Sequence, residues 1–181
     1  MSSAFGPTLE TARLILRPPV KEDLDGWASM MADEETARFI GGVQPRSTCW
    51  RALMSMGGSW ALHGFGMFSV LERDTGAWVG RLGPWQPEGW PGTEIGYGLI
   101  RSTWGKGYAV EGTSAAIDWA IAHLGWTDII HCIDEQNLAS QAVAKRLGSA
   151  LRGKGKMPAP FENETTQLWG QTAAEWKARR V

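Results

Sequence analysis

The alternation of apolar and polar positions predicts strands and helices in turn along the chain. Residues 12–17 alternate apolar and basic side chains, as a half-buried strand does, and two prolines end the pattern. Two hydrophobic runs, 65–72 and 77–82, flank the turn sequence Arg-Asp-Thr-Gly and indicate an antiparallel hairpin. Between the first strand and this hairpin, apolar side chains recur at helical spacing in three segments: 20–32, 34–40 and 47–62.

The second half of the chain begins with a loop at 83–92, which contains three prolines. The expected elements after it are a strand at 93–101, a helix at 109–124, a strand at 127–133, a helix at 137–147 and a strand at 165–171. This order predicts an α/β fold, with a mixed sheet of about six or seven strands and helices on both of its faces. We expect 1–181 to form a single domain, with 1–10 as a loose lead-in and 172–181 as a charged tail.

Residues 93–109, with the sequence TEIGYGLIRSTWGKGYA, contain the most informative pattern. On a strand, the side-chain period of two places Glu94, Gly96 and Gly98 on one face. Two missing side chains beside a carboxylate leave a groove in which a ligand can approach the backbone. The sequence therefore predicts a ligand groove that contains a carboxylate.

The turn that follows this strand contains Gly105 and Gly107, which adopt positive φ at little cost. A helix with an apolar face begins after it, near Ala109. The start of such a helix presents unpaired N–H groups and the positive end of the helix dipole, and both favour a phosphate. Without other motifs, a simple loop-to-helix turn is as good an interpretation as an anion site.

The composition argues against two classes of partner. The 18 basic and 19 acidic side chains give a net charge of −1, whereas a general nucleic-acid or membrane-surface binder needs a clustered basic excess. Two cysteines are too few for a disulfide scaffold. No apolar run approaches the roughly 18 residues of a spanning helix, and the N-terminus lacks a signal-like apolar segment. We therefore expect a cytoplasmic protein.

The segments EIGYGLIRSTWGKGYA and NLASQAVAKRLG together resemble the GNAT superfamily of N-acetyltransferases, and within it the RimJ/RimL branch. The superfamily signature is Gln/Arg-x-x-Gly-x-Gly/Ala. Trp104 stands at its first position here, a departure typical of this branch, and Gly107 and Ala109 stand at its small positions. Asn137 and Ser140 fit the Asn-x-x-Ser pair of the same branch. The opening ETARLILRP also fits, so the resemblance covers nearly the whole chain.

This resemblance implies that the sheet is splayed beside the strand at 93–101, with the pantetheine of acetyl-CoA in the gap and its pyrophosphate on the amides of 105–109. Metal ions are not expected. Arg101 and Lys106 are as compatible with solvated surface charges as with phosphate contacts. The residues implied in cofactor binding are Leu99, Ile100, Arg101, Gly105, Lys106, Gly107, Tyr108, Ala109, Asn137 and Ser140.

The implied reaction is the direct attack of a primary amine on the acetyl thioester, with both substrates bound together. Glu94 is the candidate base, and a strand amide at Leu99 or Ile100 is the candidate donor to the oxyanion. Ser140 is the candidate partner of the leaving thiolate. Asn137 is a helix N-cap and also a candidate contact to the pantetheine or substrate. The thiolate-protonating tyrosine of many family members is replaced here by Ala144.

Several properties stay open at this level. The acceptor is either a protein N-terminus or a small-molecule amine, and the loop at 85–90 with the helices of 20–62 is expected to shape its pocket. The protein is expected to be a monomer or a homodimer. One alternative function is a non-catalytic domain of the same fold that senses CoA or binds a partner. Another is a domain that binds a nucleotide at the same phosphate cradle.

Overall fold

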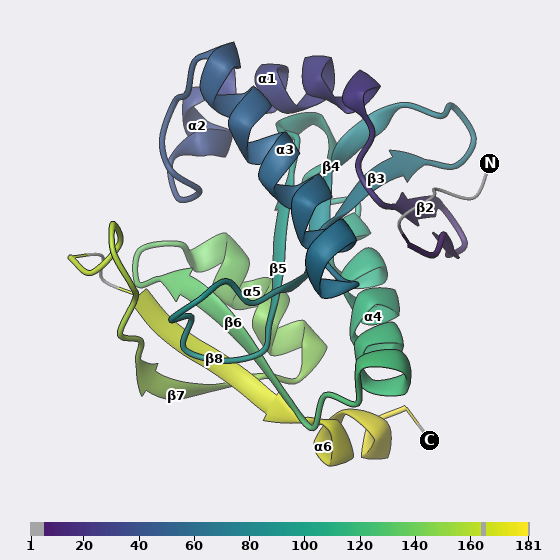
Figure 1. Cartoon of the computed structure of the whole chain (residues 1–181). Helices are drawn as coiled ribbons and strands as arrows, with labels where there is room; N and C mark the ends of the chain where they lie inside the picture. Colours follow the sequence, from purple (N-terminus) through teal and green to yellow (C-terminus); the bar gives the residue numbers. More distant parts are fainter. Residues whose placement is uncertain (1–5, 164–165, 181) are drawn as a thin grey trace.

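The computed structural model describes residues 6–163 and 166–180, and it shows an open, eight-stranded mixed sheet with helices on both faces (Figure 1). The spatial order of the strands is β1-β2-β3-β4-β5-β6-β8-β7. The strands are β1 (Leu9–Glu10), β2 (Leu14–Arg17), β3 (Phe68–Glu72), β4 (Trp78–Trp85), β5 (Glu94–Leu99), β6 (Asp128–Asp134), β7 (Ala150–Lys154) and β8 (Thr166–Thr172). The α-helices are α1 (Leu24–Ala32), α2 (Glu34–Ala37), α3 (Arg46–His63), α4 (Tyr108–Trp119), α5 (Leu138–Leu147) and α6 (Ala173–Ala178).

The one parallel pairing in the sheet joins β5 to β6, and α4 provides the crossover between them. This pairing consists of a single bridge, between Glu94 and Ile130. Beyond that bridge the two strands diverge, as Figure 1 shows, so the sheet is splayed beside β5. The fold class and the splayed sheet predicted from the sequence are confirmed.

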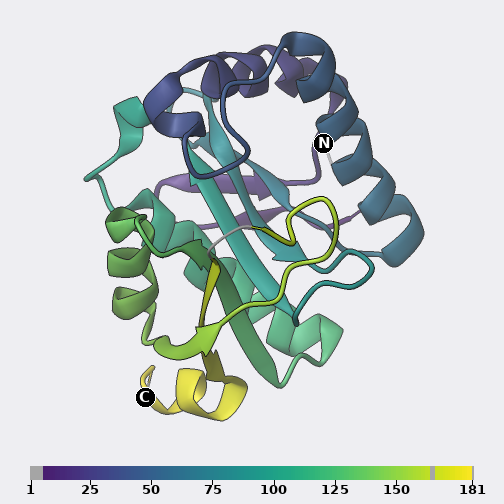
Figure 2. The same cartoon turned by 90° about the vertical axis from the view of Figure 1, so that its left-hand side faces the viewer.

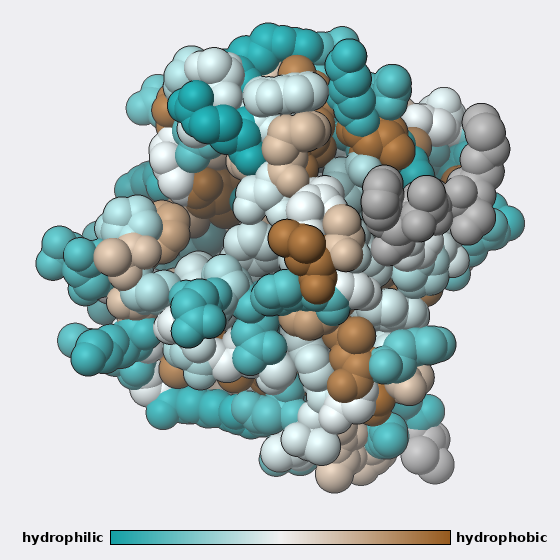
Figure 3. Space-filling model, viewed as in Figure 1, coloured by the Kyte–Doolittle hydropathy of each residue, from teal (hydrophilic) through white to brown (hydrophobic). Residues whose placement is uncertain are grey.

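Apolar side chains gather on both sides of the sheet. The larger cluster packs α4 against β2–β5 and includes Leu82, Ile95 and Ile117. The smaller cluster lies under α1–α3 and includes Trp27 and Leu53. The face drawn in Figure 3 is mostly hydrophilic, with apolar residues scattered between polar ones. No helix in the described part of the chain is long and apolar enough to cross a membrane.

The sequence pattern predicted too few strands, because the sheet has eight instead of about six or seven. Leu9–Glu10, assigned to a loose lead-in, forms β1 against β2. Ala150–Lys154 forms β7 against β8, and it was missed because all five residues are exposed and show no apolar alternation. The tail assigned to 172–181 contains α6, which Thr172 and Glu175 cap reciprocally.

Two elements also have bounds that differ from those expected from the sequence. The expected loop at 83–92 starts later, because β4 continues through Pro84 to Trp85. Proline is tolerated there because β3 stops pairing at Phe68, opposite Leu82, so no β3 carbonyl is left without a donor. The expected helix at 34–40 is limited to Glu34–Ala37.

The start of α1 is fixed to the sheet by a buried ion pair, which gives a test of the fold. Asp23 is 4% exposed and accepts two hydrogen bonds from Arg17, at 2.7 and 2.8 Å, and one from Ser69. We expect Asp23→Asn to lower the free energy of unfolding by about 3 kcal/mol, because Arg17 would keep a half-buried charge without its partner.

The matched control is Asp25→Asn, which breaks the exposed pair between Asp25, in α1, and Arg46, at the start of α3. Its cost should stay below about 1 kcal/mol. Denaturant melts followed by circular dichroism measure both values. Equal losses in the two variants would contradict a structural role for the buried pair.

Candidate active site

Two hollows open on the gap beside β5 and meet there. The first, which we call the α4–α5 groove, has a volume of about 510 Å³ and lies between the end of β5, the start of α4 and α5. The second, which we call the Glu94 cavity, has a volume of about 870 Å³ and lies between β4–β6, the segment after α2 and the loop at 157–161. The residues that line both are Arg38, Phe39, Ile40, Tyr97, Asn137 and Ser140.

The α4–α5 groove ends at the glycine turn predicted from the sequence. Gly105 and Gly107 have φ angles of +75° and +81°, and Gly107 is the N-cap of α4. Arg13 holds the turn by donating to the carbonyl of Lys106 at 2.9 Å. The first amides of α4, from Tyr108 onward, have no partner within the helix. The groove therefore ends at an array of N–H donors that suits a phosphate.

Seven of the predicted cofactor residues line this groove: Leu99, Gly105, Gly107, Tyr108, Ala109, Asn137 and Ser140. Tyr108 turns its hydroxyl away and donates to Glu72 at 2.7 Å. Ile100, Arg101 and Lys106 line neither hollow. Arg101 forms an ion pair with Glu35 at 2.7 Å, so surface pairing describes it better than a phosphate contact.

The two candidate oxyanion donors, the amides of Leu99 and Ile100, differ in their hydrogen bonding. The Ile100 amide donates to the carbonyl of Val79 on β4 at 3.0 Å, so it is engaged within the sheet. Successive residues of a strand point their amides to opposite edges, so the Leu99 amide points away from β4 and into the gap. The Leu99 carbonyl on that same edge accepts a bond from Trp104 Nε1 at 2.9 Å. Leu99 is the better candidate.

Asn137 and Ser140 begin α5 at the junction of the two hollows. Asn137 Oδ1 accepts from the Ser140 amide at 3.0 Å, which confirms the predicted N-cap. The carbonyl of Ser140 accepts from the hydroxyl of Tyr97 at 2.9 Å. Tyr97 therefore ties β5 to α5 across the gap, a role that the sequence did not indicate.

Glu94 lies in the wall of the Glu94 cavity and is 6% exposed. One carboxylate oxygen accepts from Trp90 Nε1 at 2.6 Å, and the other accepts from the Cys132 amide at 3.0 Å. Burial raises the pKa of Glu94 to about 7, although these hydrogen bonds and the charge of Arg81 favour its ionised form. A carboxylate with this pKa can take a proton near neutral pH.

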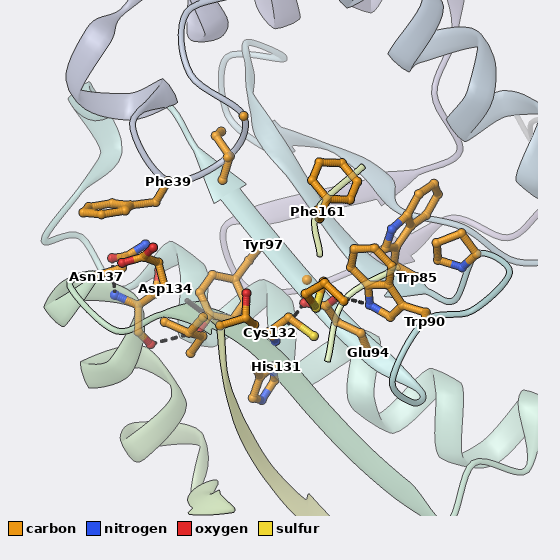
Figure 4. Close-up of a pocket in the computed structure, with 18 of the residues that line it drawn as sticks. Phe39, Trp85, Trp90, Glu94, Tyr97, His131, Cys132, Asp134, Asn137 and Phe161 are labelled. Carbon is orange, nitrogen blue, oxygen red and sulfur yellow. Dashed lines mark hydrogen bonds between the residues drawn. The ribbon is translucent and has the colours of Figure 1, made fainter. Parts of the chain in front are cut away.

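Aromatic rings surround the Glu94 end of the cavity. Figure 4 shows Trp85, Trp90 and Phe161 around Glu94, and Phe39 with Asn137 at the opposite end. The loop at 85–90, which is expected from the sequence to shape the acceptor pocket, lines this cavity. The loop at 157–161 was not predicted, and Figure 2 shows it beside the loop after β4, where Phe161 packs edge-on against Trp90.

Arg81, on β4, also lines the cavity and was missed. A usable signal was present, because Arg81 is the one charged residue in the hydrophobic run at 77–82. Cys132 is half-buried and lines the cavity beside Glu94, and burial raises the pKa of its thiol well above the usual range.

The splayed mixed sheet, with two hollows meeting at its gap, defines an acyltransferase of the GNAT type, which uses acetyl-CoA. Residues 13–150 match the family described as the acetyltransferase (GNAT) domain, and the chain belongs to this family. The resemblance seen in the sequence is therefore confirmed at the level of the superfamily.

Relatives and solved structures agree with this assignment. The N-acetyltransferase p20 of Bacillus licheniformis is 30% identical over 150 residues, which cover 81% of this chain and 84% of p20. An acetyltransferase of Agrobacterium tumefaciens has a TM-score of 0.80 at 28% identity, covering 91% of this chain and 94% of that one. RimJ of Mycobacterium smegmatis, solved in complex with CoA-disulfide, has the same fold, with a TM-score of 0.75 at 18% identity over 97% of this chain and 91% of its own.

The raised pKa of Glu94 predicts a pH dependence of stability. The carboxyl group binds its proton more tightly in the folded protein than in an unfolded chain, where its pKa is about 4.3. Its contribution to stability is therefore full at low pH and is lost as the pH rises through about 7. Between about pH 5 and about pH 8, the wild-type protein should lose about 3 kcal/mol more stability than Glu94→Gln.

Denaturant melts at the two pH values measure this difference. Glu88→Gln is the matched control, because Glu88 lines the same cavity but is exposed. Its pH dependence should match that of the wild-type protein. A Glu94→Gln protein with the wild-type pH dependence would show that Glu94 has an ordinary pKa.

Proposed function

We propose that this protein transfers an acetyl group from acetyl-CoA to a primary amine, on a peptide N-terminus or a small molecule, by direct attack in a ternary complex. The observation that supports this most is the meeting of the two hollows at Tyr97, Asn137 and Ser140. One hollow ends at a phosphate cradle and the other contains a buried carboxylate, so cofactor and acceptor can reach one point from opposite sides. Holding both substrates there removes most of the entropic barrier to their reaction.

Acetyl-CoA is proposed to lie in the α4–α5 groove, with its pyrophosphate on the amides that follow Gly107. Its pantetheine runs between β5 and α5, past Leu99 and Asn137. The thioester then reaches the junction, where its carbonyl oxygen accepts from the Leu99 amide. Residues 1–181 are proposed to form this one domain; a cytoplasmic location and a monomeric or homodimeric state stay predictions.

The amine arrives mostly as an ammonium ion, since a lysine-type amine has a pKa of about 10.4 and an α-amino group of about 7.7–8.0. Glu94 takes one of its protons, directly or through water. The free amine attacks the acetyl carbon, and the Leu99 amide stabilises the oxyanion that forms. The carbon–sulfur bond then breaks, the former amine nitrogen gives one of its two remaining protons to water, and CoA leaves as a thiolate with a conjugate-acid pKa of about 8.5, beside Ser140.

Ala144 is the observation that favours a second candidate, the non-catalytic domain. It is fully buried and lines neither hollow, so its position supplies no acid to the leaving thiolate. Amine-dependent release of thiol from acetyl-CoA excludes this candidate. Protection from thermal unfolding by CoA but not by ATP excludes the nucleotide-binding alternative.

The role of Glu94 predicts a specific pH profile. Wild-type activity should rise as the pH increases through about 7, because Glu94 must be ionised to accept a proton. Glu94→Gln should lower kcat/KM by roughly 10²-fold or more near neutral pH and recover partly above the pKa of the amine. Thiol release against a panel of peptides and small amines measures both, with Glu88→Gln as control. A Glu94→Gln enzyme with the wild-type rate and profile would leave water as the base.

The phosphate cradle predicts an effect on cofactor affinity. A side chain at Gly107 would occupy the space of the pyrophosphate, so Gly107→Val should weaken acetyl-CoA binding by about 10-fold or more. Gly125→Val is the control for backbone strain, because Gly125 also has positive φ, +67°, but caps the C-terminal end of Ala120–Leu124, the helical segment that continues α4. Calorimetry on the folded variants measures the affinities. Unchanged affinity in Gly107→Val would refute this placement of the cofactor.

A further inference from the structure

Arg81 shares one face of the sheet with Glu94, and both line the Glu94 cavity. In the register of β4 and β5, Arg81 pairs with Gly98, and Trp85 pairs with Glu94. Directly paired residues project on the same side of a sheet. The two glycines of β5 leave the floor between Arg81 and Glu94 without side chains of its own.

The guanidinium of Arg81 has no anionic partner among residues 6–163 and 166–180. Its Nε atom is buried and has no hydrogen-bond acceptor in that part of the chain. Its Nη1 atom lies 2.8 Å from the sulfur of Met67, and a thioether is a weak acceptor. Each ion pair of the described residues involves a different arginine, namely Arg13, Arg17, Arg46, Arg73, Arg101, Arg152 or Arg180.

Arg81 nevertheless stays charged. Burial lowers its pKa to about 10, and the carboxylate of Glu94 opposes this shift. Arg81 is half-buried, and a half-buried cation with only a weak acceptor is unfavourable, because its lost hydration is not fully replaced. One face of the guanidinium lies over the ring of Trp27, 5.1 Å from the ring centre, which compensates for part of this loss and leaves the Nε donor without an acceptor.

The end of the Met67 side chain lies between Arg81 and Glu94. Its sulfur contacts Arg81, and its methyl group fills the space where a Cβ of Gly96 would be. That same Cβ position is 3.7 Å from Glu94 Oε1. The cation and the carboxylate therefore lie on opposite sides of the end of Met67, and one small ligand can reach both across it.

We propose that the acceptor of this enzyme is an amine that also carries a carboxylate, which binds Arg81 while the amine faces Glu94. This inference rests on the proposed function and adds the class of acceptor. The planar fork of arginine donors matches a carboxylate in a bidentate arrangement. The aromatic rings around Glu94 suit an apolar body between or beside the two charged groups, as in a free apolar amino acid.

The remaining charged groups of the cavity do not replace Arg81. Arg38 and Glu88 are exposed at its rim. Asp134 is half-buried, and its Oδ1 accepts from the amide of Gln136. Arg81 is therefore the cation placed at the inner wall, where water is displaced by a bound ligand.

The test compares amines that differ only in the carboxylate. Thiol release is measured with L-phenylalanine against phenethylamine, L-tryptophan against tryptamine, and L-leucine against isoamylamine. The wild-type enzyme should prefer at least one amino acid by about 10²-fold in kcat/KM, mostly through KM. In Arg81→Met this preference should fall toward unity. In Arg81→Lys part of it should remain, since the charge is kept and the fork is lost.

Arg51→Met is the matched control, because Arg51 lies exposed on α3 and lines neither hollow. Its preference should equal that of the wild-type enzyme. The ratio within each pair separates recognition from general damage, since a structural defect slows both members alike. A wild-type enzyme that uses both members equally, or an Arg81→Met enzyme that keeps the full preference, would overturn the proposal.

Peptides distinguish the source of the carboxylate. The pair Ser-Asp-Ala-Ala and Ser-Asn-Ala-Ala, both with amidated C-termini, tests a peptide whose second residue is acidic. A preference for the acidic peptide that disappears in Arg81→Met assigns the carboxylate to a protein N-terminus instead of a free amino acid.

Failure of the proposed function can be distinguished from failure of the carboxylate site. If no amine supports thiol release, calorimetry with CoA present still measures the binding of L-phenylalanine and L-leucine. Binding to the wild-type protein that is lost in Arg81→Met supports the carboxylate site without catalysis. Absence of binding to the wild-type protein overturns the site as well.

Discussion

The separation of β5 from β6 is the constraint on which the site depends. A single bridge joins these parallel strands, so the edge of β5 beyond it lacks the partners of a sheet. Side chains satisfy two of its carbonyls: His131 Nδ1 bonds to Ile95 at 2.7 Å, and Trp104 Nε1 bonds to Leu99 at 2.9 Å. These two side chains bond to carbonyls and not to amides, and β6 does not pair with that edge beyond the bridge. The gap can therefore receive a ligand between β5 and α5.

The chemistry of Glu94 follows from a balance within that gap. Burial among aromatic rings raises the pKa of its carboxyl group, and donors from Trp90 and Cys132 oppose the rise. Without those donors the carboxyl would stay protonated at neutral pH and accept no proton. In full contact with water the Glu94 carboxyl would be ionised, but it would be too weak a base to remove a proton from an ammonium ion. The combination gives a pKa of about 7, the range in which a general base works best.

The sequence predicted the features that local pattern determines. The face that carries Glu94, the turn at Gly107 and the N-cap at Asn137 depend on neighbours within a few residues, and the structure shows all three. Features that depend on distant partners were missed. β7 is recognisable only by its pairing with β8, and the role of Arg81 depends on Met67, a residue of another segment. Periodicity contains no information on such contacts.

The two glycines of β5 lie in different surroundings, and the difference shows where space above the strand is left open. A Cβ at Gly96 would meet the terminal methyl group of Met67, so a side chain at this position would require the end of Met67 to move. A Cβ at Gly98 would meet only Ile40, at an ordinary 3.5 Å, and its φ is not positive. Neither packing nor backbone geometry demands glycine there. Gly98 lies beside the Leu99 amide and opposite Arg81, so the free space above it is the space that a bound thioester and its acceptor would share.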